Sequence, residues 1–242
     1  MIKFESVYKS FGKKEPVLNG IDLTLEKGEI LCLLGPSGCG KSTMVNLLTG
    51  ILIPDRGHVK IKGEEAPYKN MRASLGYMPQ HDALYEDITA RENLMFFGRM
   101  NGLTKKEARE RIPELLDTAG LGNDGDKLVS AFSGGMKRRL SLAVTLLHNP
   151  SLLILDEPTV GLDPVHRKRI WDRFDKMAAE GKTILITTHI MDEAERCGRI
   201  AMIHQGKIIA DGAPCDIIRA AGAASLEEAF LSLELKGGAD HE

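Results

Sequence analysis

A glycine-rich loop that ends in a lysine and two hydroxyl residues offers the clearest chemistry in the chain. It matches the pattern G-x-x-x-x-G-K-[ST] and follows an apolar stretch. Glycines let backbone N–H groups converge on phosphate oxygens, and the start of the next helix adds positive potential. The lysine adds a point charge, and the serine hydroxyl is a ligand for Mg²⁺. The sequence therefore predicts a nucleotide-phosphate site formed by Gly35, Pro36, Ser37, Gly38, Cys39, Gly40, Lys41, Ser42 and Thr43.

A pair of carboxylates, Asp156 and Glu157, follows the four apolar residues Leu152–Leu155. This pattern predicts that both acids lie at the C-terminal edge of a buried strand, where open α/β sheets bind their ligands. Asp156 can hold the hydration shell of Mg²⁺, and Glu157 can orient and deprotonate an attacking water. Alone, two acids often simply end a strand. Beside a phosphate loop they indicate nucleotide hydrolysis.

A second turn, Ser133-Gly134-Gly135, leads into a predicted helix over Met136–Leu147. Its free N–H groups and the helix dipole favour an anion. The alternative is that Ser133 is only a helix cap. Because the first loop already accounts for one set of phosphates, the role of a second anion-binding turn stays open on these residues alone.

The elements that must position these groups follow from hydrophobic spacing. Three short, continuously apolar runs, Ile30–Leu34, Leu152–Leu155 and Thr183–Thr187, are typical of strands buried on both faces of a parallel sheet. Alternating apolar and polar residues in the first thirty positions, and again at Gly57–Gly63, predict strands of an antiparallel layer. The predicted fold class is α/β.

Helical signals fill the region from Asp87 to Pro150. Thr89–Glu92 and Thr104–Glu107 each have a hydroxyl three residues before a glutamate, which is the spacing of a capping box. A further helix is predicted to begin at Asp163, with proline in its first turn, and to end at Gly181.

The C-terminal part is predicted to hold a hairpin over Ile200–Ile209 and a tail helix from Ser225. Within the tail, Leu226, Phe230 and Leu233 share one helical face. Such stripes usually pack on the parent domain rather than on a partner.

Composition narrows the class of protein. With 242 residues, of which 43% are hydrophobic, the chain is expected to form one domain with an inserted lobe. A net charge of -2 gives no basic surface for nucleic acid, so the runs 137–139 and 167–169 are interpreted as solvated helix faces. Four scattered cysteines favour a reducing, cytosolic compartment. No apolar run reaches the roughly 18 residues of a membrane span, so if this protein acts at a membrane, another chain must cross the bilayer.

The order of these motifs resembles the ATP-binding subunit of ABC transporters over essentially the whole chain. The resemblance rests on the phosphate loop, Gln80, the S-G-G turn, the acid pair, Gly161-Leu162-Asp163 and His189. It implies a P-loop NTPase core with a parallel sheet, an N-terminal antiparallel β layer and an inserted helical subdomain at 86–150, with a tail helix at 213–242.

The same resemblance implies ATP and Mg²⁺ as cofactors and a dimer as the working form. Each ATP would lie between the phosphate loop of one subunit and the serine-glycine turn of another, head to tail, which explains two anion-binding helix ends in one chain. The partners would be a second copy or a similar ATPase, and a transmembrane permease at the cytoplasmic face of the membrane. Nucleic acid is not an expected partner.

Individual roles also follow from the resemblance. Gln80 would touch Mg²⁺ or the water, His189 the γ-phosphate, and Asp163 the dimer interface. Phe11 would stack on adenine, with Tyr8 as the alternative. The expected catalytic residues are Glu157, His189, Gln80 and Lys41, and the expected metal ligands are Ser42, Gln80 and Asp156.

Two positions depart from the usual family pattern. Met136 stands where the signature most often has glutamine, so an amide is missing, although the serine and backbone donors remain. Phe11 replaces the commoner tyrosine and cannot donate a hydrogen bond. We expect ATPase activity to survive the loss of the amide, and we expect the phenylalanine to stack as well as a tyrosine would.

Three stretches, 80–89, 133–140 and 225–231, are similar to the branch that exports drugs, polysaccharides, lipids or sodium. By family likeness the permease would dock near Gln80, where Tyr85, Phe96 or Phe97 either line a groove or pack in the core. One alternative is a soluble ABC ATPase that remodels ribosomes or DNA, but such proteins usually carry two domains in tandem. A small-molecule kinase would leave the serine-glycine turn unexplained.

Overall fold

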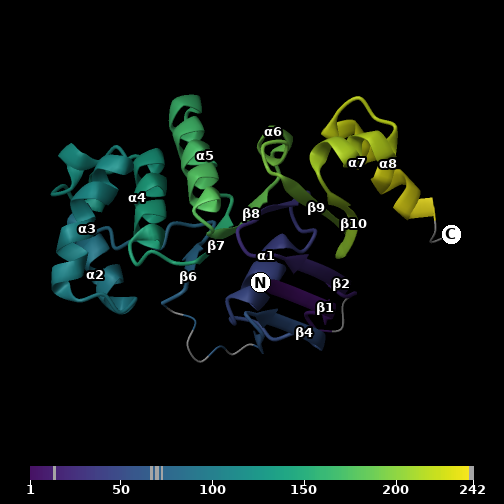
Figure 1. The fold of residues 1–242 in the computed structure, drawn as a ribbon, viewed down its shortest axis with the longest axis horizontal. Coiled ribbons are helices and arrows are strands. Elements are labelled where there is room, and N and C mark those ends of the chain that lie inside the picture. Colours follow the sequence, from purple (N-terminus) through teal and green to yellow (C-terminus); the bar gives the residue numbers. More distant parts are fainter. Residues whose placement is uncertain (13–14, 66–67, 69–70, 72, 240–242) are drawn as a thin grey trace. The chain divides into compact units, whose positions relative to one another are not determined.

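The computed structural model describes residues 1–12, 15–65, 68, 71 and 73–239, with side chains in the last helix up to Leu235. The chain divides into two compact units, Met1–Lys69 with Thr183–Glu242, and Asn70–Lys182. Figure 1 labels their helices and strands.

The first unit contains the predicted antiparallel layer. Its buried positions alternate along β1 and β2, for example at Ile2 and Phe4, because successive side chains of a strand point to opposite faces. The four strands, in the order β2-β1-β4-β5, are Leu18–Leu25, Ile2–Lys9, Arg56–Ile61 and Glu64–Glu65.

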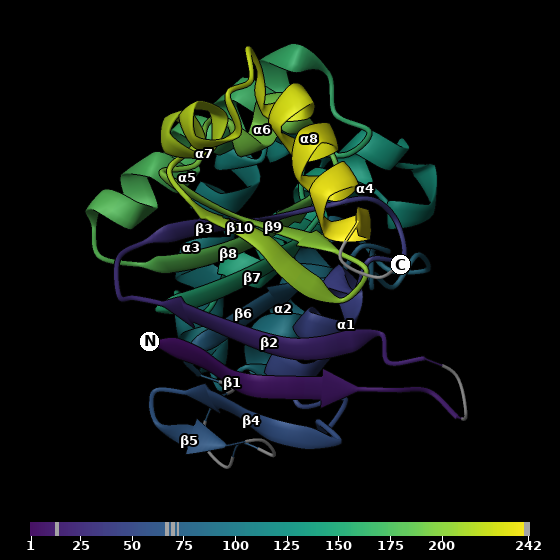
Figure 2. The ribbon, with the colours of Figure 1, turned by 90° about the vertical axis from the view of Figure 1, so that its right-hand side faces the viewer.

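The first unit also holds a mixed sheet with the order β10-β9-β3-β8 (Figure 2). Strand β3 is parallel to both β8 and β9, whereas β9 and β10 form an antiparallel hairpin, as predicted. The strands are Lys207–Gly212, Arg199–His204, Ile30–Leu34 and Thr183–Thr188. Helix α1 (Lys41–Leu48) follows β3, and the short α6 (Met191–Ala194) follows β8.

The segment 213–242 is predicted as one tail helix. Its described part, 213–239, contains two helices, α7 (Pro214–Ala221) and α8 (Leu226–Ala239). Gly222 ends α7 because it adopts a left-handed conformation with φ of 66°. In α8, Leu226 and Phe230 are buried, as expected for a helix that packs on its own domain.

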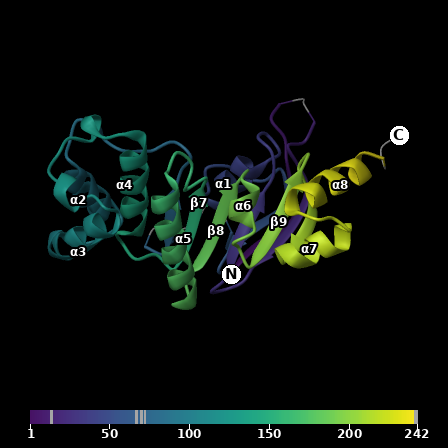
Figure 3. The ribbon, with the colours of Figure 1, turned by 90° about the horizontal axis from the view of Figure 1, so that it is seen from above.

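The second unit contains two parallel strands, β6 (Leu75–Met78) and β7 (Leu152–Asp156). Helices α2, α3 and α4 contact one another (Figure 3). In the sequence, two short 3₁₀ turns follow α3 and precede α4. The helices α2 to α5 are Ala90–Met100, Lys105–Thr118, Gly134–Leu146 and Pro164–Ala179, and the turns are Gly122–Asp124 and Val129–Ala131.

Both predicted capping boxes are present, at Thr89 with Glu92 and at Thr104 with Glu107. Asp163 caps α5, and Pro164 occupies its first turn. The division of the chain into one domain with a helical subdomain at 86–150 stays a prediction. In the part of the chain that is described, no helix has the length and apolar character needed to cross a bilayer.

Candidate functional site

The phosphate loop connects β3 to α1, and its glycines are required by the fold. A Cβ on Gly35 would lie 2.3 Å from the carbonyl oxygen of Ile203, and Gly40 has a φ of 117° that side chains rarely adopt. The N–H of Gly206, in the β9–β10 turn, donates to the carbonyl of Cys39 at 3.1 Å. The loop is therefore fixed by contacts with β9 and the β9–β10 turn, while residues 36–38 stay exposed.

The start of α1 is suited to an anion. Among the described residues no side chain caps this helix at Gly40, so its first N–H groups are available to a ligand. The buried ammonium of Lys41 donates to the carbonyls of Gly35 and Pro36 at 2.7 and 2.8 Å, and Ser42 is exposed. Cations, hydroxyls and N–H groups gathered in this way fit the phosphates of ATP.

The thiol of Cys39 lies in the same loop, 3.9 Å from the nitrogen of Lys41. Burial raises the pKa of the Cys39 thiol, and this effect is larger than the lowering of the pKa by Lys41. The group is therefore uncharged at neutral pH and does not repel a phosphate.

In the second unit, the ends of two parallel strands bring three predicted site residues together. Asp156 ends β7, Glu157 follows it, and both are buried, with 5% and 8% of their surface exposed. Gln80 follows the neighbouring strand β6, and its amide Nε2 donates to Oε2 of Glu157 at 3.2 Å. This is the edge at which parallel sheets bind ligands.

The backbone of Glu157 is held in an unusual conformation. Its φ is 49°, in the left-handed region that non-glycine residues seldom occupy. Such a conformation costs on the order of 1–3 kcal/mol and persists only where neighbouring groups enforce it. Arg138 supplies part of that support, because its Nη2 donates to the carbonyls of Asp156 and Glu157, each at 2.6 Å.

The burial of Arg138 corrects the interpretation of residues 137–139 as a solvated face. Only 5% of Arg138 is exposed, and Arg139 is half-buried and donates to the carbonyls of Ala119 and Gly120. The spacing i, i+4 and i+7 places Arg138 on the face of α4 that also carries Leu142 and Thr145, both buried. A helical-period count on this segment places Arg138 on the apolar face of α4, but its burial and its partners depend on what packs against that face.

The serine-glycine turn begins α4. Ser133 is the N-cap, and its hydroxyl accepts a hydrogen bond from the N–H of Met136 at 3.3 Å. Ser133 therefore caps the helix in this structure, as the capping alternative states.

The same turn contains Gly134 and Gly135. No described atom lies within 4 Å of a Cβ placed on Gly134, and the nearest to one on Gly135 is 3.6 Å away. Neither glycine has a positive φ, so the chain's own fold does not require glycine here.

The remaining predicted residues are accessible. Asp163 is exposed and accepts from the N–H of His166 at 3.1 Å, and the backbone and side chain of His166 hold the pKa of Asp163 below its usual value. His189 is exposed just after β8. Phe11 is 47% exposed, which suits a stacking role, whereas the ring of Tyr8 lies against Gly20.

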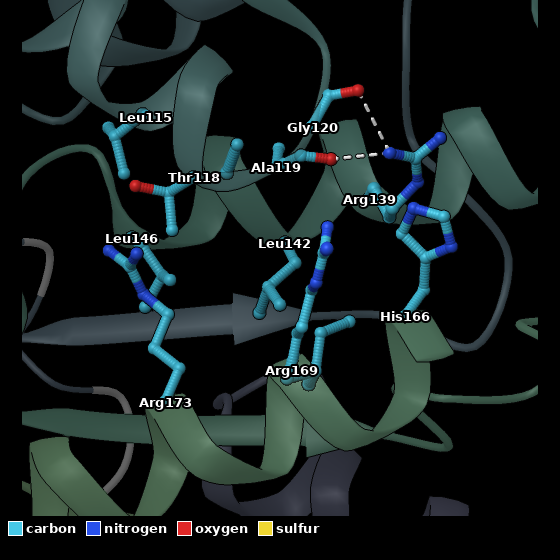
Figure 4. Close-up of a pocket in the computed structure, with 12 residues that line it drawn as sticks. Leu115, Thr118, Ala119, Gly120, Arg139, Leu142, Leu146, His166, Arg169 and Arg173 are labelled. Atoms are coloured by element: carbon cyan, nitrogen blue, oxygen red, sulfur yellow. Dashed lines mark hydrogen bonds between the residues drawn. The ribbon is translucent and has the colours of Figure 1, made fainter. Parts of the chain in front are cut away.

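A pocket in the second unit lies outside the predicted site. Figure 4 shows leucines of α3 and α4 and three arginines among the residues that line it, with Arg139 hydrogen-bonded to the carbonyls of Ala119 and Gly120. These carbonyls lie at the C-terminal end of α3, where the helix dipole favours a positive charge. None of the residues given above as site candidates lines this pocket, so we assign it to helix packing.

Comparisons with known proteins agree with the geometry. The family model of the ABC transporter matches residues 18–160. Nod factor export ATP-binding protein I of Paraburkholderia xenovorans is 47% identical over 220 residues, covering 90% of this chain and 72% of that protein. The protein of the same name from Burkholderia lata is 44% identical over 252 residues, covering 99% and 82%.

Solved structures give the same result. An ATP-binding subunit of an ABC transporter superposes with a TM-score of 0.88 and 32% identity, covering 97% of this chain and 99% of that one. A dimeric ATP-binding cassette in a post-hydrolysis state with ADP and Pi gives a TM-score of 0.80 and 28% identity, covering 88% and 98%. Such dimers and the names of the relatives support a dimer and a transporter partner for this chain.

The predictions of an α/β P-loop fold, of ATP binding and of ATP hydrolysis are therefore confirmed. The residue assignments within the site stay predictions. The chain belongs to the ABC transporter family, as one of its ATP-binding and ATP-hydrolysing subunits.

Proposed function

We propose that this chain is one half of a head-to-tail dimer whose two composite sites hydrolyse ATP to drive export through a membrane permease. One observation supports the head-to-tail arrangement: among the described residues, no atom lies within 4 Å of a Cβ placed on Gly134 and none closer than 3.6 Å to one on Gly135, so these contacts do not require glycine at either position. Glycine permits close approach of a ligand to the backbone at a helix start. The phosphate that a partner subunit holds in its own loop is a ligand of this kind.

The nucleotide would be held by residues of different chemical character. The loop from Gly35 to Thr43 supplies backbone N–H groups, and Lys41 exchanges its carbonyl acceptors for phosphate oxygens. Phe11 offers an exposed ring for the adenine.

Ser42, Gln80 and Asp156 would supply oxygen ligands to Mg²⁺, an ion that prefers hard oxygen ligands. When bound, Mg²⁺ neutralises charge on the phosphate oxygens during phosphoryl transfer.

Glu157 is the proposed general base. It would accept a proton from the attacking water, and its buried position limits competition from bulk solvent. The amide of Gln80 supports this assignment because it already holds one oxygen of the carboxylate. His189 would contact the γ-phosphate, and Asp163 would lie at the dimer interface.

Docking of the permease is supported by a cluster of three aromatic rings on the second unit. Tyr85 contacts Phe96 and Phe97, with ring centroids 4.9 and 5.9 Å apart. Tyr85 is 51% exposed and Phe96 39%, so these two rings do not pack in the core. Exposed apolar rings of this kind mark binding surfaces. The permease would bind here, at the cytoplasmic face of the membrane, and the export direction follows the relatives.

The direct test of this proposal is Glu157→Gln. The variant should bind ATP, accumulate as a dimer on a sizing column and hydrolyse at least about 100-fold more slowly, since the general base is lost. Turnover at the parent rate would remove Glu157 from the mechanism. Monomeric elution with bound ATP would argue against the head-to-tail dimer.

A further inference from the structure

Arg138 joins two backbone segments that both carry proposed hydrolytic groups. Its Nη1 donates to the carbonyls of Pro79 and Gln80 at 2.9 and 3.0 Å. Its Nη2 donates to the carbonyls of Asp156 and Glu157 at 2.6 Å each. Nη1 and Nη2 of one planar guanidinium thus each donate to two carbonyls, Nη1 near the end of β6 and Nη2 near the end of β7.

The charge of Arg138 is also compensated. Nη1 lies 3.1 Å from the carboxylate of Asp82, whose side chain is 21% exposed, whereas that of Arg138 is 6% exposed. A buried guanidinium is costly unless it is paired and hydrogen-bonded. Here the pairing and the hydrogen bonds all come from the segments that follow β6 and β7.

The position of Arg138 on α4 adds a connection to the serine-glycine turn. Arg138 follows Ser133 by five residues in one uninterrupted helix. At a rise of 1.5 Å per residue, about 7.5 Å of helix separates them. A displacement of the turn therefore moves the guanidinium, and with it the carbonyls of Gln80 and Glu157.

We propose that Arg138 is a positioning residue that clamps Gln80 to Glu157 and transmits engagement of the Ser133 turn to the hydrolytic geometry. The proposal rests on the roles of Gln80 and Glu157 given above. It also accounts for the left-handed backbone of Glu157, which two of the hydrogen bonds from Arg138 support. Lysine cannot replace this function, because an ammonium lacks the planar fork that reaches both segments.

The test is Arg138→Lys, with Arg139→Lys as the matched control. Arg139 makes the same kind of carbonyl contacts, but to Ala119 and Gly120 at the end of α3. Arg138→Lys should lower kcat by about 10- to 100-fold, as misplacement of catalytic groups does, while KM and ATP affinity stay at parent values. Arg139→Lys should keep kcat close to that of the parent.

A double-mutant cycle with Gln80→Ala shows whether Arg138 acts through Gln80. If it does, the double variant loses no more kcat than the worse single variant. Thermal melting verifies the fold of each protein. Should Arg138→Lys fail to fold, Asp82→Ala, which removes only the outer ion pair, should lower kcat a few-fold with KM unchanged.

Parent-level kcat in Arg138→Lys, an equal loss in Arg139→Lys, or additive losses in the cycle would each overturn the inference. If the fallback variant is needed, parent-level kcat in Asp82→Ala would do so. The result for Glu157→Gln separates the two proposals. If Glu157→Gln abolishes turnover and Arg138→Lys does not reduce it, only the clamp is wrong. If Glu157→Gln retains turnover, the proposed general base is wrong.

Discussion

Two helix starts in this molecule are suited to bind phosphate, yet they are built differently. At α1, the backbone of Gly35 passes so close to Ile203 that a side chain would clash, and Gly40 adopts a conformation reserved for glycine. At α4, Gly134 faces open space among the described residues, and Ser133 caps its own helix. The first site is shaped by the chain's own packing. The second has glycines that the chain's packing does not need.

The electrostatics of the two starts differ as well. Lys41 is the first residue of α1, whereas the first three residues of α4, Gly134 to Met136, are uncharged. The α4 turn therefore depends on its helix dipole and a hydroxyl, which attract an anion more weakly than an ammonium does. We infer that the loop at α1 binds ATP first and that the α4 turn engages afterwards.

The largest expected effect is that of Lys41→Ala on the α1 site. Loss of charge-assisted hydrogen bonds should weaken ATP binding by about 100-fold, measured by titration calorimetry. Lys60→Ala, which removes a surface lysine paired with Glu5, is the matched control and should bind ATP normally. Unchanged affinity in Lys41→Ala would contradict the assignment of the loop.

Ser133→Ala tests the α4 site. ATP affinity of the isolated subunit should stay the same, whereas hydrolysis should fall by about 10- to 100-fold because one phosphate donor is lost. Loss of the cap should also cost about 1 kcal/mol of unfolding free energy. Ser225→Ala removes a similar cap, on Glu228 of α8, and should affect stability alone. Equal ATPase rates in the two variants would show that Ser133 is only a cap.

Glycine replacements compare the two starts directly. Gly35→Ala should lower the free energy of unfolding by about 1–3 kcal/mol, because the new Cβ meets the carbonyl of Ile203. Gly134→Ala should melt at the parent temperature, since its Cβ meets no described atom, and yet lose about tenfold of its ATPase activity. A parent-like ATPase rate in Gly134→Ala would show that glycine at position 134 is not needed for ATP hydrolysis.

Met136→Gln should have the smallest effect. The N–H of Met136 already donates to Ser133, and the side chain is half-buried. Restoring the usual amide should therefore change kcat by no more than about threefold, the scale of one exposed hydrogen bond. A tenfold rise in a steady-state ATPase assay would mean that the missing amide limits this enzyme.

Much of the site was predictable because its signals are local. The loop from Gly35 to Thr43 is a contiguous motif, and the acid pair follows an apolar run long enough to identify a strand. The helix caps at Thr89 and Asp163 were likewise predictable, because a cap depends on residues within one turn.

Arg138 was not predicted, because burial of a charge depends on what packs against its helix. In the sequence, residues 137–139 are simply three consecutive basic residues. In the fold, consecutive positions of a helix face directions 100° apart, so Lys137 pairs with Glu86, Arg138 enters the interior and Arg139 meets the end of α3. The tail region differed for another reason: a single glycine, Gly222, divides it into two helices.

Residue order alone thus predicted the phosphate loop, the acid pair and the helix caps, since each depends on neighbours within a few positions, and the order of the motifs along the chain indicated the family. Tertiary structure decided three further points. It brought Gln80 against Glu157, because β6 and β7 lie parallel although 77 positions separate these residues. It directed Arg138 to both strand ends, and it showed that glycine is required at position 35 but not at position 134. Each of these depends on contacts between distant segments, which a linear pattern does not encode.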